Sequence, residues 1–206
     1  MKIYRLPVIL LAVATLALGS FAQTSEPNNI DPSKAGQPTA KYQFPSANKR
    51  FRRFVNDTVG VGAWIGTGIG ATFGQLDNTP PEWKKTSKGF GRRVASNFGI
   101  NAIEQTSIYG ISEALRQDPK YRPSDSKNVG KRIVHALRSG VTATNRSGNT
   151  VFSPAKVAAP FIANVSAVKL WYPDRYSVQD GVRRGAYAFG FSFGFNLIEE
   201  FILRRK

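Results

Sequence analysis

The chain has 206 residues, and its 29 lysines and arginines against 13 acidic residues give a net charge of +16. It has no cysteine and one histidine, which excludes disulfides, thiolate metal sites and cysteine catalysis. The basic excess indicates nucleic acid or an anionic surface as a partner.

Residues 1–22 have the pattern of a cleavable secretory signal peptide. Lys2 and Arg5 form a basic start, an apolar run of eleven residues follows, and Ser20 and Ala22 supply the small residues of a cleavage site. The run is shorter than the about 20 residues of a spanning helix, and an uncleaved N-terminal anchor is the alternative. Cleavage leaves 184 residues with 27 basic and 13 acidic side chains, a net charge of +14. We therefore expect export to the periplasm or outer membrane, with anionic lipid or an acidic envelope polymer as the partner and no nucleic acid.

Residues 23–48 are rich in proline, serine and asparagine and contain few large apolar side chains. Such a segment buries too little apolar surface to offset its ordering entropy, which predicts a disordered linker. A single helical domain is expected over residues 49–206. Its first residues mix cations with aromatic rings, which is typical of an exposed helix start or of an interfacial anchor. The cations at both ends of this domain are the predicted membrane or anion contacts: Lys49, Arg50, Arg52, Arg53, Arg204, Arg205 and Lys206.

Residues 59–76 form an uncharged, glycine-rich segment. Its glycines recur every four residues, which on a helix forms a groove that a second helix can approach closely. Each glycine costs about 1 kcal/mol relative to alanine in an exposed helix, so packing or lipid must offset that cost. Residues 185–197 repeat the small-residue spacing. The predicted helix-packing positions are Gly62, Gly66, Gly70, Gly74, Ala186, Gly190 and Gly194.

The remaining segments also favour helices. Apolar residues recur at helical spacing over residues 89–117 and 129–144, and a serine followed by proline is a typical start for a helix over 153–172. The last helix is expected over 177–203. We predict an all-α bundle of about five helices with glycine-zipper packing, which we also expect to associate with a membrane and to form homo-oligomers. Both glycine-rich segments alternate with period two as well, so a small outer-membrane β-barrel is the alternative.

Four short motifs carry a resemblance to a protein family. Residues 78–83 (NTPPEW), 89–93 (GFGRR), 117–121 (QDPKY) and 171–173 (WYP) are together similar to a family of uncharacterised exported proteins of acidobacteria-type soil bacteria. The resemblance spans about residues 55–201. It implies no activity and assigns no site residue.

No catalytic constellation is evident in the sequence. Residues 190–194 match the G-x-S-x-G nucleophile elbow, but no histidine follows Ser192, and the sole histidine, His135, precedes it. Glu104 and Glu113 are placed on opposite faces of a helix, which does not favour a shared metal. The glycine runs match no dinucleotide or phosphate loop. We therefore expect a structural or interaction protein of the envelope, not an enzyme, with no cofactor or metal; the alternative is an exported hydrolase with an unrecognised site.

Overall fold

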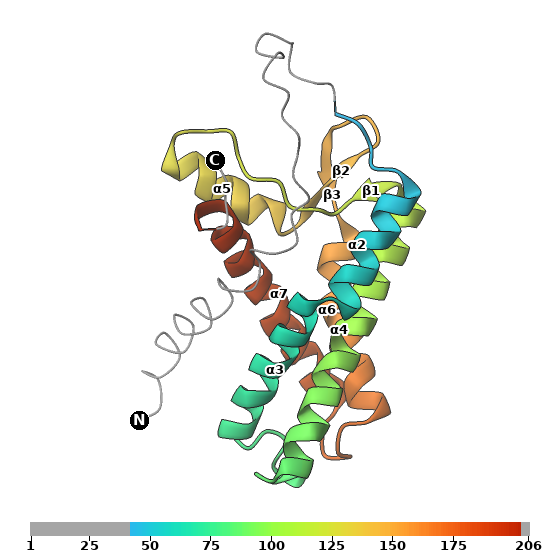
Figure 1. Ribbon diagram of the computed structural model, residues 1–206, viewed down its shortest axis with the longest axis vertical. Helices are drawn as coiled ribbons and strands as arrows, with labels where there is room; N and C mark the ends of the chain where they lie inside the picture. The colour runs from blue at the N-terminus through green and yellow to red at the C-terminus, as the bar shows by residue number, and fades with distance from the viewer. Residues whose placement is uncertain (1–41, 203–206) are drawn as a thin grey trace.

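A computed structural model describes residues 42–202 of the chain. The predicted signal peptide, most of the predicted linker and the basic C-terminus at Arg204, Arg205 and Lys206 lie outside the described residues. The described part is mostly helical, as predicted for an all-α fold, and adds a small sheet (Figure 1). Within these residues, no helix combines the length and the apolar character needed to cross a bilayer.

The long helix α4 extends along much of the length of the described fold (Figure 1). Helices α2 and α3 follow one another along one side of α4, α6 packs against α4, and α7 packs against both α6 and α5. The helices are α2 (Ala47–Val59), α3 (Val61–Leu76), α4 (Ser87–Leu115), α5 (Val129–Ser139), α6 (Pro154–Leu170) and α7 (Val178–Phe201), with a 3-10 turn at Pro81–Trp83. The strands are β1 (Gln117–Asp118), β2 (Thr142–Asn145) and β3 (Thr150–Phe152), which form an antiparallel sheet in the order β1-β2-β3.

Side-chain caps explain where several helices begin. Thr86, Asn128, Ser153 and Ser177 each accept a hydrogen bond from a backbone N–H in the first turn of α4, α5, α6 and α7 respectively. Such caps satisfy amide groups that have no partner within the helix. The predicted start of the helix at residues 153 and 154 is confirmed, because Ser153 is the cap and Pro154 the first helical residue.

The predicted helix over residues 129–144 is wrong in its last part. Helix α5 ends at Ser139, and Thr142 pairs with Phe152 across β2 and β3. β-Branched residues in this stretch fit a pleated strand well. Gly148, with a φ of +86°, allows the turn that brings β3 back onto β2. The strand depends on this pairing between segments and not on local periodicity.

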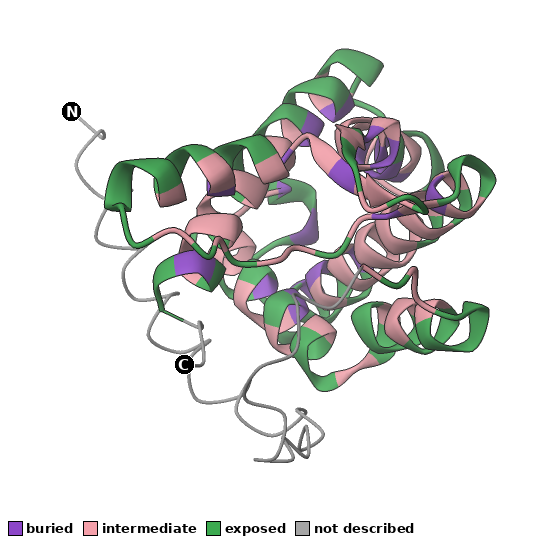
Figure 2. Cartoon of the chain, turned by 90° about the horizontal axis from the view of Figure 1, so that it is seen from above, coloured by how far each residue is buried: buried purple, intermediate pink, exposed green. Residues whose placement is uncertain are grey.

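Both glycine-rich segments are helices, α3 and α7, but a seam in which two helix backbones approach closely lies elsewhere. It joins α6 and α7, where a Cβ added to Gly181 would lie 2.8 Å from the Cα of Val165, and one added to Gly185 would lie 2.8 Å from the Cα of Phe161. Buried positions are few, whereas exposed ones cover the outer faces (Figure 2). Small side chains at every fourth position of α6 supply much of this core: Ala155, Ala159, Ala163 and Ala167.

The predicted packing positions are used only in part. On α3, a Cβ at Gly70 would lie 2.8 Å from Asn97 Nδ2 and one at Gly74 would lie 3.1 Å from Arg93 Cδ, so these two glycines face α4. The other positions face outward within the described fold, so their predicted helix-packing role stays a prediction. A Cβ would meet no atom of the described chain within 4 Å at Gly66, Gly190 or Gly194, and Gly62 and Ala186 are exposed.

Candidate functional site

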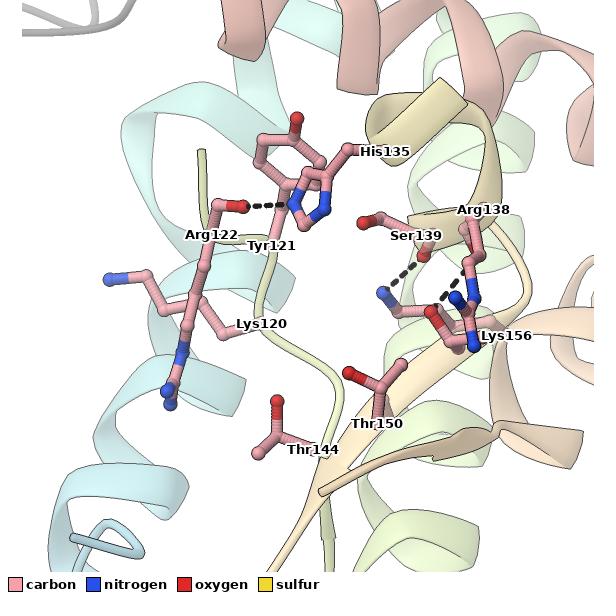
Figure 3. A pocket seen from close by; sticks show the side chains of 11 residues that line it. Lys120, Tyr121, Arg122, His135, Arg138, Ser139, Thr144, Thr150 and Lys156 are labelled. Atoms are coloured by element: carbon pink, nitrogen blue, oxygen red, sulfur yellow. Dashed lines mark hydrogen bonds between the residues drawn. The ribbon is translucent and has the colours of Figure 1, made fainter. Parts of the chain in front are cut away.

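A pocket of about 100 Å³ lies between α5, the start of α6 and the sheet (Figure 3). Its lining is strongly basic, since the loop after β1 supplies Lys120 and Arg122, α5 supplies Arg138, and α6 supplies Lys156. The ammonium group of Lys120 points away from the centre of the pocket in Figure 3. We call this space the basic pocket.

Lys156 lies in the first turn of α6, where the cap Ser153 fixes the local backbone. Its Nζ donates a 2.8 Å hydrogen bond to the carbonyl oxygen of Ser139, and it has no ion-pair partner among the described residues. Burial lowers the pKa of Lys156 to about 8, and the charges of Glu199 and Asp118 oppose this only in part. The fold therefore holds an ammonium group in a place that disfavours its charge.

The loop after β1 forms the opposite wall of the basic pocket, and a hydrogen bond connects it to α5. His135 Nε2 donates a 2.8 Å hydrogen bond to the carbonyl oxygen of Arg122. The Arg122 guanidinium donates to Asp118 at 2.8 Å and stacks on Tyr42, with 4.3 Å from its Cζ to the ring centroid. Tyr42 belongs to the predicted linker, so the folded part begins several residues before the predicted boundary at 49.

Asp118 holds this wall of the basic pocket in place through several hydrogen bonds. The carboxylate is buried and accepts from Arg122, from Arg53 at 3.3 Å and from the backbone N–H of Lys120 at 3.2 Å. These bonds connect α2, β1 and the loop after it. The negative charge of Asp118 is thus compensated inside the fold, and Arg122 is shared between that carboxylate and the pocket.

A second buried carboxylate, Glu200, holds α7 against α5. It accepts from Arg132 Nε at 2.7 Å, from the Tyr121 hydroxyl at 2.6 Å and from the backbone N–H of Ser124 at 2.9 Å. Burial opposes its charge, but these hydrogen bonds outweigh burial and lower the pKa of Glu200. This network fixes the position of α5, which forms one wall of the basic pocket.

The predicted cationic contacts near residue 49 divide into two groups. Arg50 pairs with Glu113 and Arg53 pairs with Asp118, so both have partners inside the fold, and their predicted contact with a membrane or anion stays a prediction. Each carboxylate holds its arginine against α4 or β1. Lys49 and Arg52 are exposed, and their contact with anions stays a prediction.

Helix α5 presents an apolar face that the rest of the described chain covers only in part. Four side chains at helical spacing form it, and we call them the α5 stripe: Val129, Ile133, Val134 and Leu137. Exposed cations flank it, namely Lys127, Lys131 and Arg138. Val134 is 65% exposed. Apolar side chains gathered on one face beside cations are typical of helices that lie in a membrane interface.

The alternative of an exported hydrolase requires a serine–histidine pair, and the described residues contain no such pair that involves Ser192 or His135. Ser192 lies inside the continuous helix α7 and donates to the carbonyl oxygen of Phe189, so it is not on a strand-to-helix turn. His135 bonds to Arg122 instead. Among residues 42–202, no three carboxylates or histidines gather as metal ligands.

Three of the four motifs behind the family resemblance meet at the far end of α4. Residues 78–83 surround Arg93, whose guanidinium donates to the carbonyl oxygens of Thr79 and Pro80, both at 2.9 Å. Trp171 donates from Nε1 to Ser96 at 2.8 Å beside them. These motifs are therefore structural at this end.

Comparison of the chain with known protein families, curated proteins and solved structures finds no match, so the family resemblance stays a prediction.

Sequence reasoning missed the central member of the basic pocket. Lys156 stands alone as a charge in an otherwise small and apolar segment over residues 153–168. A cation on the alanine-rich face of a helix is a usable signal, because burial of a charge is costly unless something compensates it. Arg138 and the strand hydroxyls gave no such signal, because β2 was expected to be helical.

Proposed function

We propose that this protein is exported to the bacterial envelope and binds a membrane surface rich in anionic lipid through helix α5. The observation that carries the proposal is the α5 stripe with its flanking cations. In this role the protein acts as a structural or interaction component and not as an enzyme. The export pattern of residues 1–22 and the predicted net charge of +14 support the location and the sign of the surface.

The geometry favours a helix that lies in the plane of the membrane. The stripe runs along one side of α5, while Arg132 and Ala136 on the other side face α7. Apolar side chains can then enter the headgroup boundary without any change in the packed core. Each cation near an anionic surface contributes about 1 kcal/mol, and this contribution falls as salt screens the charges.

The test is co-sedimentation with vesicles of phosphatidylcholine, with and without phosphatidylglycerol. The unaltered protein should bind mainly the vesicles that contain phosphatidylglycerol. Val134→Asp should weaken this binding by about tenfold or more, because it removes an exposed isopropyl group that would enter the membrane interface and adds a charge that the interface repels.

Val61→Asp is the matched control. Val61 and Val134 are both 65% exposed, and both substitutions change the net charge by the same amount. Binding by Val61→Asp should stay within about twofold of the unaltered protein, since α3 is not part of the proposed surface. Equal loss in both variants would show that charge alone drives binding, for example to any acidic polymer, and would contradict the role of the stripe.

A further inference from the structure

We infer that the basic pocket binds a phosphate group, held by Lys156 and Arg138 over the strand hydroxyls of Thr144 and Thr150. This is a site separate from the α5 stripe, although α5 contributes to both. It needs no membrane, so it can be tested independently of the proposed function.

The cations of the pocket supply more positive charge than the fold neutralises. Neither Lys156 nor Arg138 has an ion-pair partner among the described residues. Asp118, the buried carboxylate behind the pocket, is already paired with Arg53 and Arg122. Two uncompensated cations in a recess favour a ligand that carries up to two negative charges, and an oxyanion would relieve the cost of burying Lys156.

The floor of the pocket supplies neutral donors. Thr144 pairs with Asp118 on one side and with Thr150 on the other, so the three residues form a row across the sheet. Figure 3 shows the side chains of Thr144 and Thr150 close together on the side of the pocket away from His135. Within residues 42–202 neither hydroxyl has a hydrogen-bond partner. Both are therefore free to donate to a ligand oxygen.

The size and chemistry of the pocket restrict the ligand class. A volume of about 100 Å³ suits one tetrahedral oxyanion. Arginine binds phosphate through a planar fork and lysine as a point charge, and hydroxyl donors complete such sites. Free phosphate in solution and a phosphate monoester at the end of a larger molecule, such as a lipid headgroup, share this chemistry.

The test is calorimetric titration of the folded protein with inorganic phosphate. Lys156→Met should lower the affinity by about tenfold or more, whereas Lys169→Met should leave it within about twofold. Lys169 is exposed at the other end of α6, so the two variants have the same net charge and differ only in the pocket. Arg138→Gln, at an exposed position, should also weaken binding without affecting the fold.

Three results would overturn the inference. They are the absence of saturable phosphate binding, an equal loss in Lys156→Met and Lys169→Met, and acetate binding as tightly as phosphate. A vesicle experiment separates the two sources. If Lys156→Met weakens binding to phosphatidic acid but not to phosphatidylglycerol, the headgroup monoester is the ligand. If Lys156→Met loses inorganic phosphate and binds both vesicles normally, the ligand is free phosphate.

Discussion

Arg93 shows how a single cation can organise one end of this fold without a carboxylate. It is 2% exposed and donates to the carbonyl oxygens of Thr79, Pro80 and Lys84 and to the side-chain oxygen of Gln75. These acceptors come from α3 and from the segment that connects α3 to α4. The planar guanidinium reaches all of them at once, which a lysine ammonium cannot do.

We therefore expect Arg93→Lys to destabilise the protein by about 2–4 kcal/mol, because it leaves buried carbonyl groups without donors. The adjacent Arg92→Lys is the control, since Arg92 is exposed and its change should cost less than about 0.5 kcal/mol. Urea unfolding followed by circular dichroism measures both. A loss for Arg93→Lys as small as that for Arg92→Lys would contradict this account.

The lowered pKa of Lys156 predicts that the folding stability of the protein depends on pH. Burial lowers its pKa to about 8 in the folded protein from an ordinary value of 10.5, Glu199 and Asp118 oppose this shift, and Arg138 also lines the pocket. Below pH 8 it is protonated in both states and the folded state carries the full penalty. Between these two values the unfolded chain binds more protons, so folding stability rises with pH.

Lys156→Met should therefore be more stable than the unaltered protein at pH 7, by about 1–3 kcal/mol, and the difference should shrink toward pH 10. Paired urea titrations at the two pH values give the measurement, and comparison with the variant removes the effect of other titrating groups. A difference that stays constant or grows with pH would show that Lys156 is not destabilised by its charge.

At the scale of elements, the contact between α6 and α7 decides how the bundle packs. Gly185→Ala should destabilise the fold by about 1–3 kcal/mol, since the new Cβ would lie 2.8 Å from the backbone of Phe161. Gly190→Ala should stabilise it by up to about 1 kcal/mol, because a Cβ there meets nothing within 4 Å and alanine favours the helix. Thermal unfolding of the pair measures both changes, and equal effects would contradict the assigned seam.

The sequence predicted that α7 is a helix and that its packing face is Ala186, Gly190 and Gly194, whereas α6 packs against the face with Gly181 and Gly185. Gly181 and Gly185 lie on one side of α7, and Gly190 and Gly194 lie on another. Both sets have four-residue spacing, so local pattern cannot distinguish them. The choice depends on the partner helix, because Phe161 and Val165 of α6 lie against the first set. The same limit explains Gly66, which faces away from α4.

The sheet and the basic pocket could not be predicted from local sequence pattern, because both depend on contacts between separate segments. Residues 142–144 are compatible with a continued helix, and they become a strand only because Thr150–Phe152 returns beside them. The basic pocket then arises from segments far apart in the sequence, between Lys120 and Lys156. The amphipathic character of α5 could be read from its periodicity, whereas the exposure of its apolar side depends on what the rest of the fold leaves uncovered.

At the scale of the whole molecule, apolar side chains remain exposed on more than one helix. Besides the α5 stripe, Tyr187, Phe191 and Phe195 form an exposed row on α7 beside the open positions Gly190 and Gly194. A bilayer interface or a second copy of the chain would cover such surfaces, and the predicted homo-oligomer stays a prediction. Arg183, one turn before Tyr187 on α7, is paired with Asp180. The cations beside the α5 stripe have no ion-pair partner among the described residues, which is why we assign the anionic lipid surface to α5.

The most direct test of the α5 assignment measures how deep this helix lies in a membrane. The chain contains no cysteine, so a single nitroxide label can be attached at Val134→Cys, with Thr72→Cys on the exposed surface of α3 as the control. Electron paramagnetic resonance with membrane-soluble and water-soluble relaxation agents then reports depth on vesicles containing phosphatidylglycerol. The account predicts a label at position 134 about 5–10 Å below the headgroup boundary and a label at 72 in water. A label at 134 that stays as accessible to water as the one at 72, while the protein is vesicle-bound, would contradict it.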